Sequence, residues 1–65
     1  MISEETRKKW DDKIEAIIEA CYGGVVNFTD WENEFVDSLS ITRSKGNDLS
    51  HRQSKVLNRI YKKVN

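Results

Sequence analysis

The chain has 65 residues, with 11 basic and 11 acidic side chains, no proline and one cysteine. This length predicts one small domain, residues 1–65, near the lower limit for folding on a hydrophobic core alone, and a single cysteine excludes an intramolecular disulfide framework. No apolar run approaches the roughly 18 residues of a membrane span and no signal peptide is visible, so we expect a cytoplasmic protein.

A first helix is predicted over residues 3–22. Ser3 is a suitable N-cap, and Glu4 and Glu5 follow it in the first turn, where the helix dipole favours negative charge. Gly23 and Gly24 supply the conformational freedom that ends a helix. The apolar residues recur at helical spacing and predict a buried stripe of Trp10, Ile14, Ile17, Ile18 and Cys21. The outward face carries Asp11, Asp12, Glu15 and Glu19.

A second helix is predicted over residues 30–43. Residues 25–28 are too short for a sheet, and we expect them to form an extended connector whose apolar side chains fill the core. Thr29 and Glu32 form a capping box, in which each side chain satisfies a backbone N–H of the other residue. The pattern places Trp31, Phe35, Val36 and Leu39 inward, and Asp30, Glu34 and Asp37 outward.

A third helix is predicted over residues 51–64, after a loop over residues 44–48. Ser50 and Gln53 form a second capping box. Around this helix, one sector holds a mostly apolar, core-facing stripe of Leu49, Gln53, Val56, Leu57, Ile60 and Val64. The cations occupy another sector of the helix surface. We call the cationic sector the basic ridge; it consists of Arg52, Lys55, Arg59, Lys62 and Lys63.

The neutral net charge conceals an uneven distribution. Residues 1–42 carry four basic and ten acidic side chains, whereas residues 43–65 carry seven basic and one acidic. This division predicts either two faces of opposite potential or internal pairing of the two halves. The fold that we expect is an all-α, compact three-helix domain.

Two dipeptides and a longer motif carry a family resemblance. They are Trp31-Glu32, Phe35-Val36 and the run from Leu49 to Ile60, which reads Leu-Ser-x-x-Gln-x-x-Val-Leu-x-x-Ile. With this pattern, residues 28–64 resemble small helical modules of phage proteins and of DNA replication and repair factors. The resemblance implies a helical fold and a role in the DNA metabolism of a phage or mobile element.

The sequence predicts neither an enzyme nor a cofactor. His51, the only histidine, is expected to be an exposed residue at a helix start, and Cys21 a small buried hydrophobe. No Cys/His pattern for zinc is present, and the carboxylates of Asp30, Glu34 and Asp37 lack the loop spacing of a calcium site. Trp10, Trp31, Phe35 and Tyr22 lie on or near apolar stripes, so we expect core packing rather than base stacking from them.

Three functions remain open. In the first, a non-enzymatic accessory protein binds a protein partner of the DNA-processing machinery, or a second copy as a homodimer; candidate partner-binding residues are Asp30, Glu34, Asp37 and Tyr61. In the second, the chain binds nucleic acid through cations that meet phosphates; the candidates are Arg43, Lys45, Arg52, Lys55, Arg59, Lys62 and Lys63. In the third, the acidic faces mimic nucleic acid and inhibit an enzyme that binds it. The balanced net charge gives the protein-interaction role a slight lead.

Overall fold

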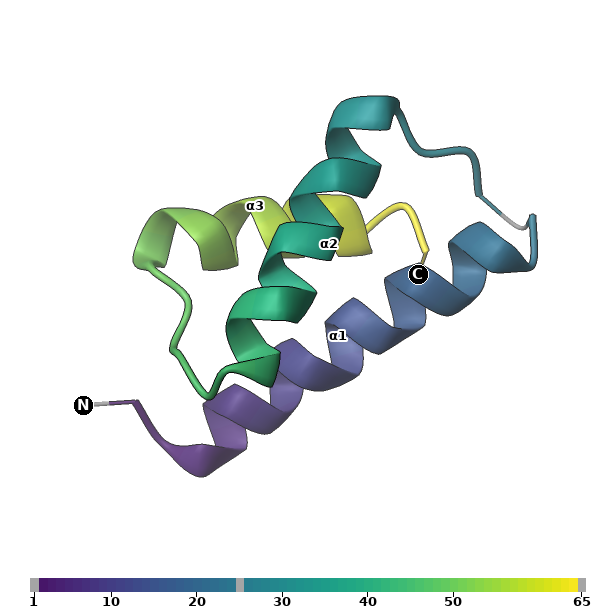
Figure 1. Ribbon diagram of the computed structural model, residues 1–65. Coiled ribbons are helices and arrows are strands. Elements are labelled where there is room, and N and C mark those ends of the chain that lie inside the picture. The colour runs from purple at the N-terminus through teal and green to yellow at the C-terminus, as the bar shows by residue number, and fades with distance from the viewer. Residues whose placement is uncertain (1, 25, 65) are drawn as a thin grey trace.

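Three α-helices form the domain. A computed structural model describes residues 2–24 and 26–64, and in these residues the helices are α1 (Glu4–Tyr22), α2 (Asp30–Ser44) and α3 (His51–Tyr61), without any strand (Figure 1). The all-α, three-helix prediction is confirmed. Val25, the first residue of the predicted connector, lies outside the described residues, and Phe28 of the same connector packs against the core.

Each helix begins where its cap predicts. The hydroxyl of Ser3 accepts a hydrogen bond from the Thr6 backbone N–H. Both capping boxes are complete: the hydroxyl of Thr29 accepts from the N–H of Glu32 at 3.1 Å, and the Glu32 carboxylate accepts from the N–H of Thr29 at 2.9 Å. Ser50 and Gln53 make the corresponding pair of bonds at 3.1 and 2.8 Å. These local contacts fix the helix starts without help from tertiary packing.

The helix ends depend on positive backbone φ angles and on a tightened last turn. α2 ends in a Schellman motif, in which Gly46 has a φ of 81°, its N–H bonds to the carbonyl of Arg43, and the Asn47 N–H bonds to that of Thr42. α3 ends at Tyr61, so the predicted end at residue 64 is wrong. The reason is that the N–H groups of Lys63 and Val64 bond to carbonyls only three residues back, which tightens the chain into turns.

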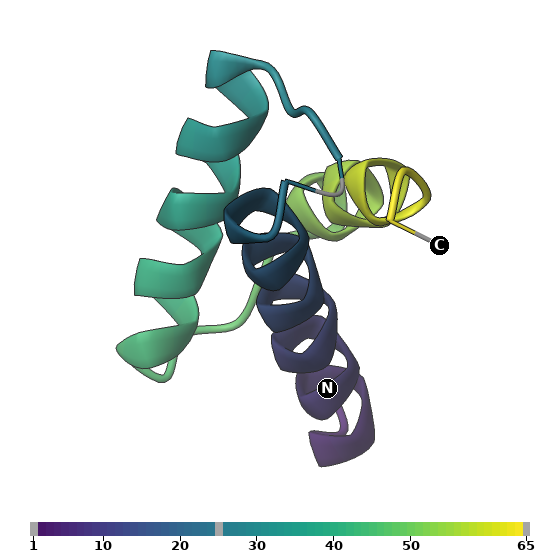
Figure 2. The ribbon, with the colours of Figure 1, turned by 90° about the vertical axis from the view of Figure 1, so that its right-hand side faces the viewer.

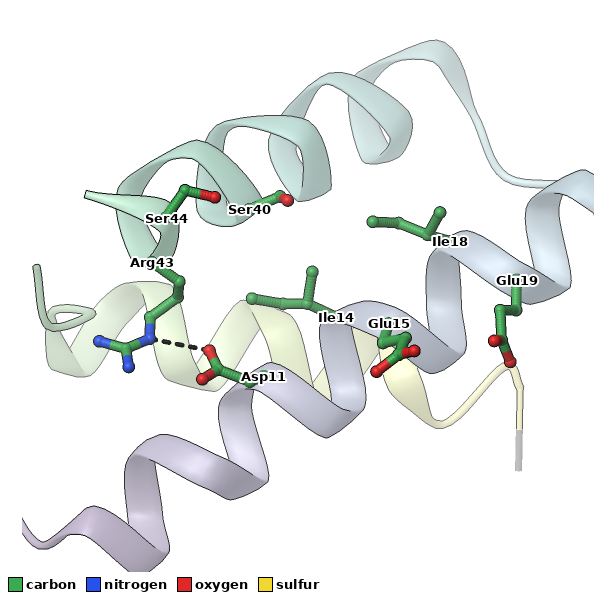
Figure 3. A pocket seen from close by; sticks show the side chains of 8 residues that line it. All are labelled: Asp11, Ile14, Glu15, Ile18, Glu19, Ser40, Arg43 and Ser44. Atoms are coloured by element: carbon green, nitrogen blue, oxygen red, sulfur yellow. Dashed lines mark hydrogen bonds and ion pairs between the residues drawn. The ribbon is translucent and has the colours of Figure 1, made fainter. Parts of the chain in front are cut away.

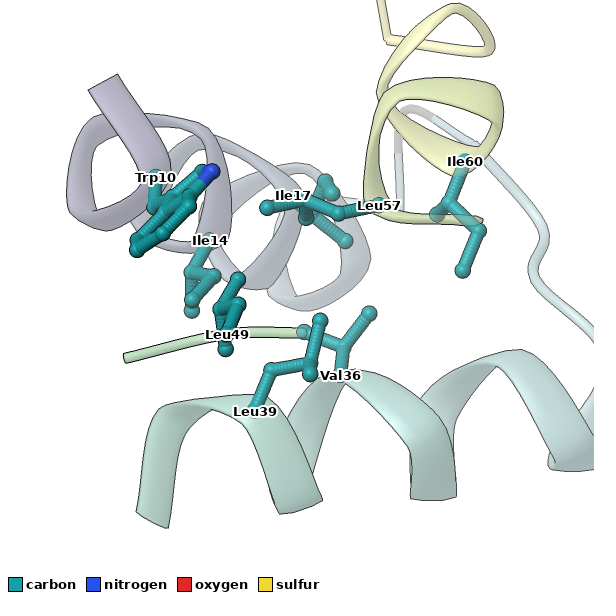
Figure 4. Packing of buried hydrophobic residues seen from close by; sticks show 8 residues of the cluster. All are labelled: Trp10, Ile14, Ile17, Val36, Leu39, Leu49, Leu57 and Ile60. Atoms are coloured by element: carbon teal, nitrogen blue, oxygen red, sulfur yellow. The ribbon is translucent and has the colours of Figure 1, made fainter. Parts of the chain in front are cut away.

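The first helix is the central element of the packing. α2 and α3 each make their more extensive contacts with α1 and touch one another less (Figure 1). In the view of Figure 2, α2 lies to the left of α1 and α3 to its right. The core lies where the three helices approach one another (Figure 4); its buried cluster is Trp10, Ile14, Ile17, Val36, Leu39, Leu49, Leu57 and Ile60.

Three residues predicted to be buried are exposed. Trp31 has 59% of its surface exposed and Tyr22 88%, and Cys21 is also exposed. At the start of α2 the buried position belongs to Glu32, which rotates Trp31 out of the core. At the end of α1, Cys21 and Tyr22 lie at the border of a cavity of about 150 Å³ beside α2, and the Cys21 thiol donates to Asn33 of α2 at the surface. Phe35 is half-buried against the core, as an edge residue would be.

Candidate interaction surface

The basic ridge is only partly free of internal contacts. Arg52, Lys55, Arg59 and Lys62 are exposed, and within residues 2–24 and 26–64 none of them forms an ion pair. Four exposed cations that form no ion pair among these residues leave a surface with positive potential. Lys45, at the C-terminal cap of α2, is exposed as well.

Arg43 stands apart from these cations because its donors are used inside the molecule. Its Nε donates to Oδ1 of Asp11 at 2.9 Å and its Nη1 donates to the carbonyl of Asn47 at 2.6 Å. Its Nη1 also lies 3.5 Å from Oδ1 of Asp48, and its guanidinium carbon is 5.7 Å from the centre of the Trp10 ring. With only 13% of the side chain exposed, Arg43 ties α2 to α1 and to the loop before α3.

Lys63 is also engaged within the chain. Its Nζ donates to Oε2 of Glu32 at 2.6 Å, and Glu32 is buried. The hydrogen bond from Lys63, followed by that from the Thr29 N–H, lowers the pKa of Glu32 below its ordinary value. Glu32 therefore remains a carboxylate although only 8% of its surface is exposed, and it contributes no free negative charge to the surface around it.

Trp31 and Phe35 form an exposed aromatic stack on α2. Their ring centres are 5.2 Å apart and the rings are inclined by 16°. The two residues are one helical turn apart, a spacing that brings side chains together on a helix surface. Phe35 packs inward against the core, so Trp31 is held over it with its other side open to solvent.

The position of this stack follows from the contacts of α2. At about 100° per residue, Ser40, Val36, Glu32, Phe35 and Trp31 follow one another round the helix. Ser40 lines a groove beside α1, and Glu32 meets Lys63, which follows α3. The aromatic stack therefore lies on the edge of α2 that is turned toward α3.

The edge of α3 that is turned toward α2 lies across the core residues from the edge that contacts α1. Asn58 accepts a hydrogen bond from Lys13 of α1 at 2.5 Å, so its edge of α3 faces α1. Val56, Arg52 and Arg59 lie beyond the core residues Leu57 and Ile60, on the other edge. The surface that results is called here the α2–α3 face; it comprises Trp31, Phe35, Arg52, Val56 and Arg59.

The α2–α3 face has a consistent chemistry. α3 contains no acidic residue, and the same edge of α2 continues with Ser38 and Thr42. The Glu32 carboxylate on α2 is buried and paired with Lys63, whereas Glu34, about one turn from Trp31, is exposed at the border of this face. The α2–α3 face thus combines two aromatic rings, one aliphatic side chain and two unpaired guanidinium groups.

The predicted partner-binding residues do not form one group. Asp30, Glu34 and Asp37 are exposed on the side of α2 that faces away from the core, as the sequence indicates. Tyr61 lies elsewhere, half-buried against the core where α3 meets α1, with Lys13 Nζ 5.6 Å from its ring centre. Tyr61 therefore has a structural environment, and it is separate from the three carboxylates.

A groove between α1 and α2 was not foreseen from the sequence. It has a volume of about 530 Å³ and is lined by Asp11, Ile14, Glu15, Ile18, Glu19, Ser40, Arg43 and Ser44. Figure 3 shows Ile14 and Ile18 directed into the space between the helices, with Glu15 and Glu19 further out on α1. The spacing of acidic residues on α1 was the available signal, but the groove itself depends on how α2 lies beside α1.

Metal-binding and membrane-spanning features are not found in the part of the chain that the structure describes. No three His, Cys, Asp or Glu side chains in residues 2–24 and 26–64 are grouped so that they could hold a metal ion. None of the described helices combines the length and apolar content needed to cross a bilayer.

Comparison with known proteins gives no relative from which a function could be transferred. No protein-family model matches the chain, and no curated protein and no solved structure is significantly similar to it.

Proposed function

We propose that this protein is a non-enzymatic interaction module that binds a protein partner through the α2–α3 face. The observation that carries the proposal is the Trp31–Phe35 stack, because a tryptophan in a domain of this size is worth burying and this one is 59% exposed. Tryptophan and arginine are the residues that most often dominate the binding energy of protein interfaces. Trp31 is accompanied on the same face by two arginines, Arg52 and Arg59.

The chemistry of the face defines the kind of partner. Trp31 and Phe35 on α2 and Val56 on α3 offer apolar side chains, and Arg52 and Arg59 lie on the same edge of α3 as Val56. A complementary surface has an apolar centre with carboxylates at its rim, since rim charges steer association and select partners. The resemblance to phage and replication modules leads us to propose the DNA-processing machinery as the setting in which this partner acts.

Capture from extracts of the source cells tests this function. Tagged wild-type protein is compared with Trp31→Ala and with Ile41→Ala, a matched control because Ile41 is also on α2 and is 57% exposed. We expect Trp31→Ala to lose a captured protein that the wild type and Ile41→Ala both retain. Capture of the same proteins by Trp31→Ala and wild type would contradict a binding role for the α2–α3 face.

A second candidate function, nucleic-acid binding, is favoured by the four unpaired cations Arg52, Lys55, Arg59 and Lys62. Such cations would contact phosphates, and the open side of Trp31 offers a place for an unpaired base to stack. The test is a salt titration of binding to labelled single- and double-stranded DNA, with Lys55→Glu/Arg59→Glu as the control. This candidate predicts that log affinity falls linearly with log salt and that the double variant loses binding; absence of binding at low salt would reject it.

The third possibility, an acidic mimic of nucleic acid, stays a prediction. Its carboxylates include Asp30, Glu34 and Asp37, which are exposed on α2. Asp11, by contrast, is paired with Arg43 and is less available to a partner.

A further inference from the structure

The groove between α1 and α2 combines an apolar floor with unpaired carboxylates. Ile14 is buried and Ile18 half-buried at its floor, while Glu15 and Glu19 are exposed on its α1 side (Figure 3). Among the described residues neither glutamate forms an ion pair, whereas Asp11 at the end of the groove is held by Arg43 at 2.9 Å. The groove therefore suits a cationic segment that also carries aliphatic carbon.

The chain itself carries a segment with this character on another side of the molecule. Lys55 and Arg59 are exposed on α3, one turn apart, and Lys62 follows them. Glu15 and Glu19 are separated by the same four residues, so at about 1.5 Å of rise per residue both pairs are spaced by about 6 Å. The methylene stems of lysine and arginine also cover apolar surface while their charged ends stay in water.

We propose that the groove between α1 and α2 binds the Lys55–Arg59 ridge of a second copy of this chain. In this contact Glu15 and Glu19 of one copy meet Lys55 and Arg59 of the next, and the aliphatic stems of the cations lie over Ile18. The groove and the ridge are different surfaces of one chain, so the contact is head-to-tail and each copy retains a free groove or a free ridge. The association extends from copy to copy unless the geometry closes a ring.

This inference does not rest on the Trp31–Phe35 stack, and the two proposals can succeed or fail separately. They meet at Arg59, which belongs both to the ridge and to the α2–α3 face. An acidic partner on the α2–α3 face therefore competes with the groove of a second copy for the same guanidinium group.

Sedimentation of charge-reversed variants tests the contact. The ridge variant is Lys55→Glu/Arg59→Glu, the groove variant is Glu15→Lys/Glu19→Lys, and the combined variant carries all four substitutions and restores the net charge of zero. A matched control, Lys9→Glu/Lys45→Glu, changes the net charge as much as the ridge variant does but lies outside the groove and the ridge. All of these side chains are exposed, and far-ultraviolet circular dichroism verifies that each variant is folded.

The expected result is a set of five linked outcomes. The wild type self-associates at low salt and dissociates as salt rises, because the contact depends on charge. The ridge and groove variants each remain monomeric, the control associates more strongly than the ridge variant, and the combined variant associates again because both surfaces are reversed together. A monomeric wild type at low salt, equal loss in the ridge variant and the control, or a combined variant that stays monomeric would each overturn the proposal.

Discussion

Lys63 Nζ donates a hydrogen bond to Oε2 of Glu32 at 2.6 Å and so joins the turn after α3 to the first turn of α2. The other carboxylate oxygen of Glu32 accepts from the Thr29 N–H and completes the capping box. One carboxylate thus both starts a helix and links two helices. Because Glu32 occupies the buried position, the adjacent Trp31 is directed to the surface, where it forms the centre of the α2–α3 face.

The first prediction concerns stability in acid. The pKa of Glu32 is lowered by Lys63 and by the Thr29 N–H, and that of Asp48 is lowered by Arg7, whose Nε donates to it at 2.7 Å. A lowered pKa means that the folded state binds the proton less well than the unfolded chain does. The stabilisation of the folded state by these two carboxylates is therefore complete above their pKa in the unfolded chain. It is lost as the pH falls through their pKa in the folded state, from about pH 5 downward.

Replacing Glu32 by Gln isolates one of these two carboxylates. Glutamine can still accept from the Thr29 N–H in the capping box, but it has no charge to pair with Lys63. We expect the Tm of Glu32→Gln, followed by circular dichroism from pH 7 to pH 3, to fall less than that of the wild type. Asp48, whose pKa is also lowered, still contributes to the fall in the variant. Parallel curves for wild type and variant would show that Glu32 has the same pKa in the folded and unfolded states.

The second prediction concerns the role of Arg43. Its guanidinium bonds to Asp11 on α1 and to the carbonyl of Asn47 in the loop before α3, and a lysine ammonium cannot reproduce this forked arrangement. We expect Arg43→Lys to lower the free energy of unfolding by about 1.5–3 kcal/mol, as for hydrogen bonds that involve a charged group. Urea denaturation measures the change.

Lys45→Ala serves as the comparison for Arg43→Lys. Lys45 is exposed two residues further along the chain, so its replacement should change the free energy of unfolding by no more than about 0.5 kcal/mol. Equal effects of the two substitutions would show that the contacts of Arg43 add nothing to stability.

The third prediction concerns the core. The Leu57 side chain is fully buried in the cluster that joins all three helices (Figure 4). Leu57→Ala leaves a cavity and should cost about 2–5 kcal/mol, which is most of the stability available to so small a domain. We expect largely unfolded protein by circular dichroism at room temperature. A cooperative unfolding transition close to that of the wild type would place Leu57 outside the core.

The fourth prediction concerns Cys21, whose thiol donates to Oδ1 of Asn33 at 3.4 Å on the surface. We expect a thiol-specific reagent such as dithionitrobenzoate to label the folded protein completely without denaturant. Cys21→Ser should change the free energy of unfolding by no more than about 0.5 kcal/mol, as at other surface sites. Labelling that requires denaturant would return Cys21 to the buried stripe that the sequence predicts.

The parts of the fold that were predictable from the sequence are those determined locally. The boxes of Thr29 with Glu32 and of Ser50 with Gln53 set two helix starts, since each needs only residues within one turn. Most of the core also follows from spacing alone, as for Ile14, Val36 and Leu57.

Local pattern does not determine how far each helix is rotated toward its neighbours. Trp31 and Glu32 are adjacent, and hydrophobicity favours burying the tryptophan; a distant residue, Lys63, makes burial of Glu32 favourable instead. The sequence pattern places Arg43 with the anion-binding cations for a similar reason, because its partners Asp11 and Asn47 meet it only after the helices pack. The candidate sites thus depend on contacts between residues far apart in the sequence.

The most direct test of the proposed function is site-specific photocrosslinking from the α2–α3 face. A benzoylphenylalanine placed at position 31 is compared with one at position 41, two sites on α2 of nearly equal exposure on different sides of the helix. If the α2–α3 face binds a protein partner, irradiation in the source cells gives a discrete crosslinked product from position 31 and not from position 41. Crosslinking to the same product from both positions, or from position 41 alone, would contradict that assignment.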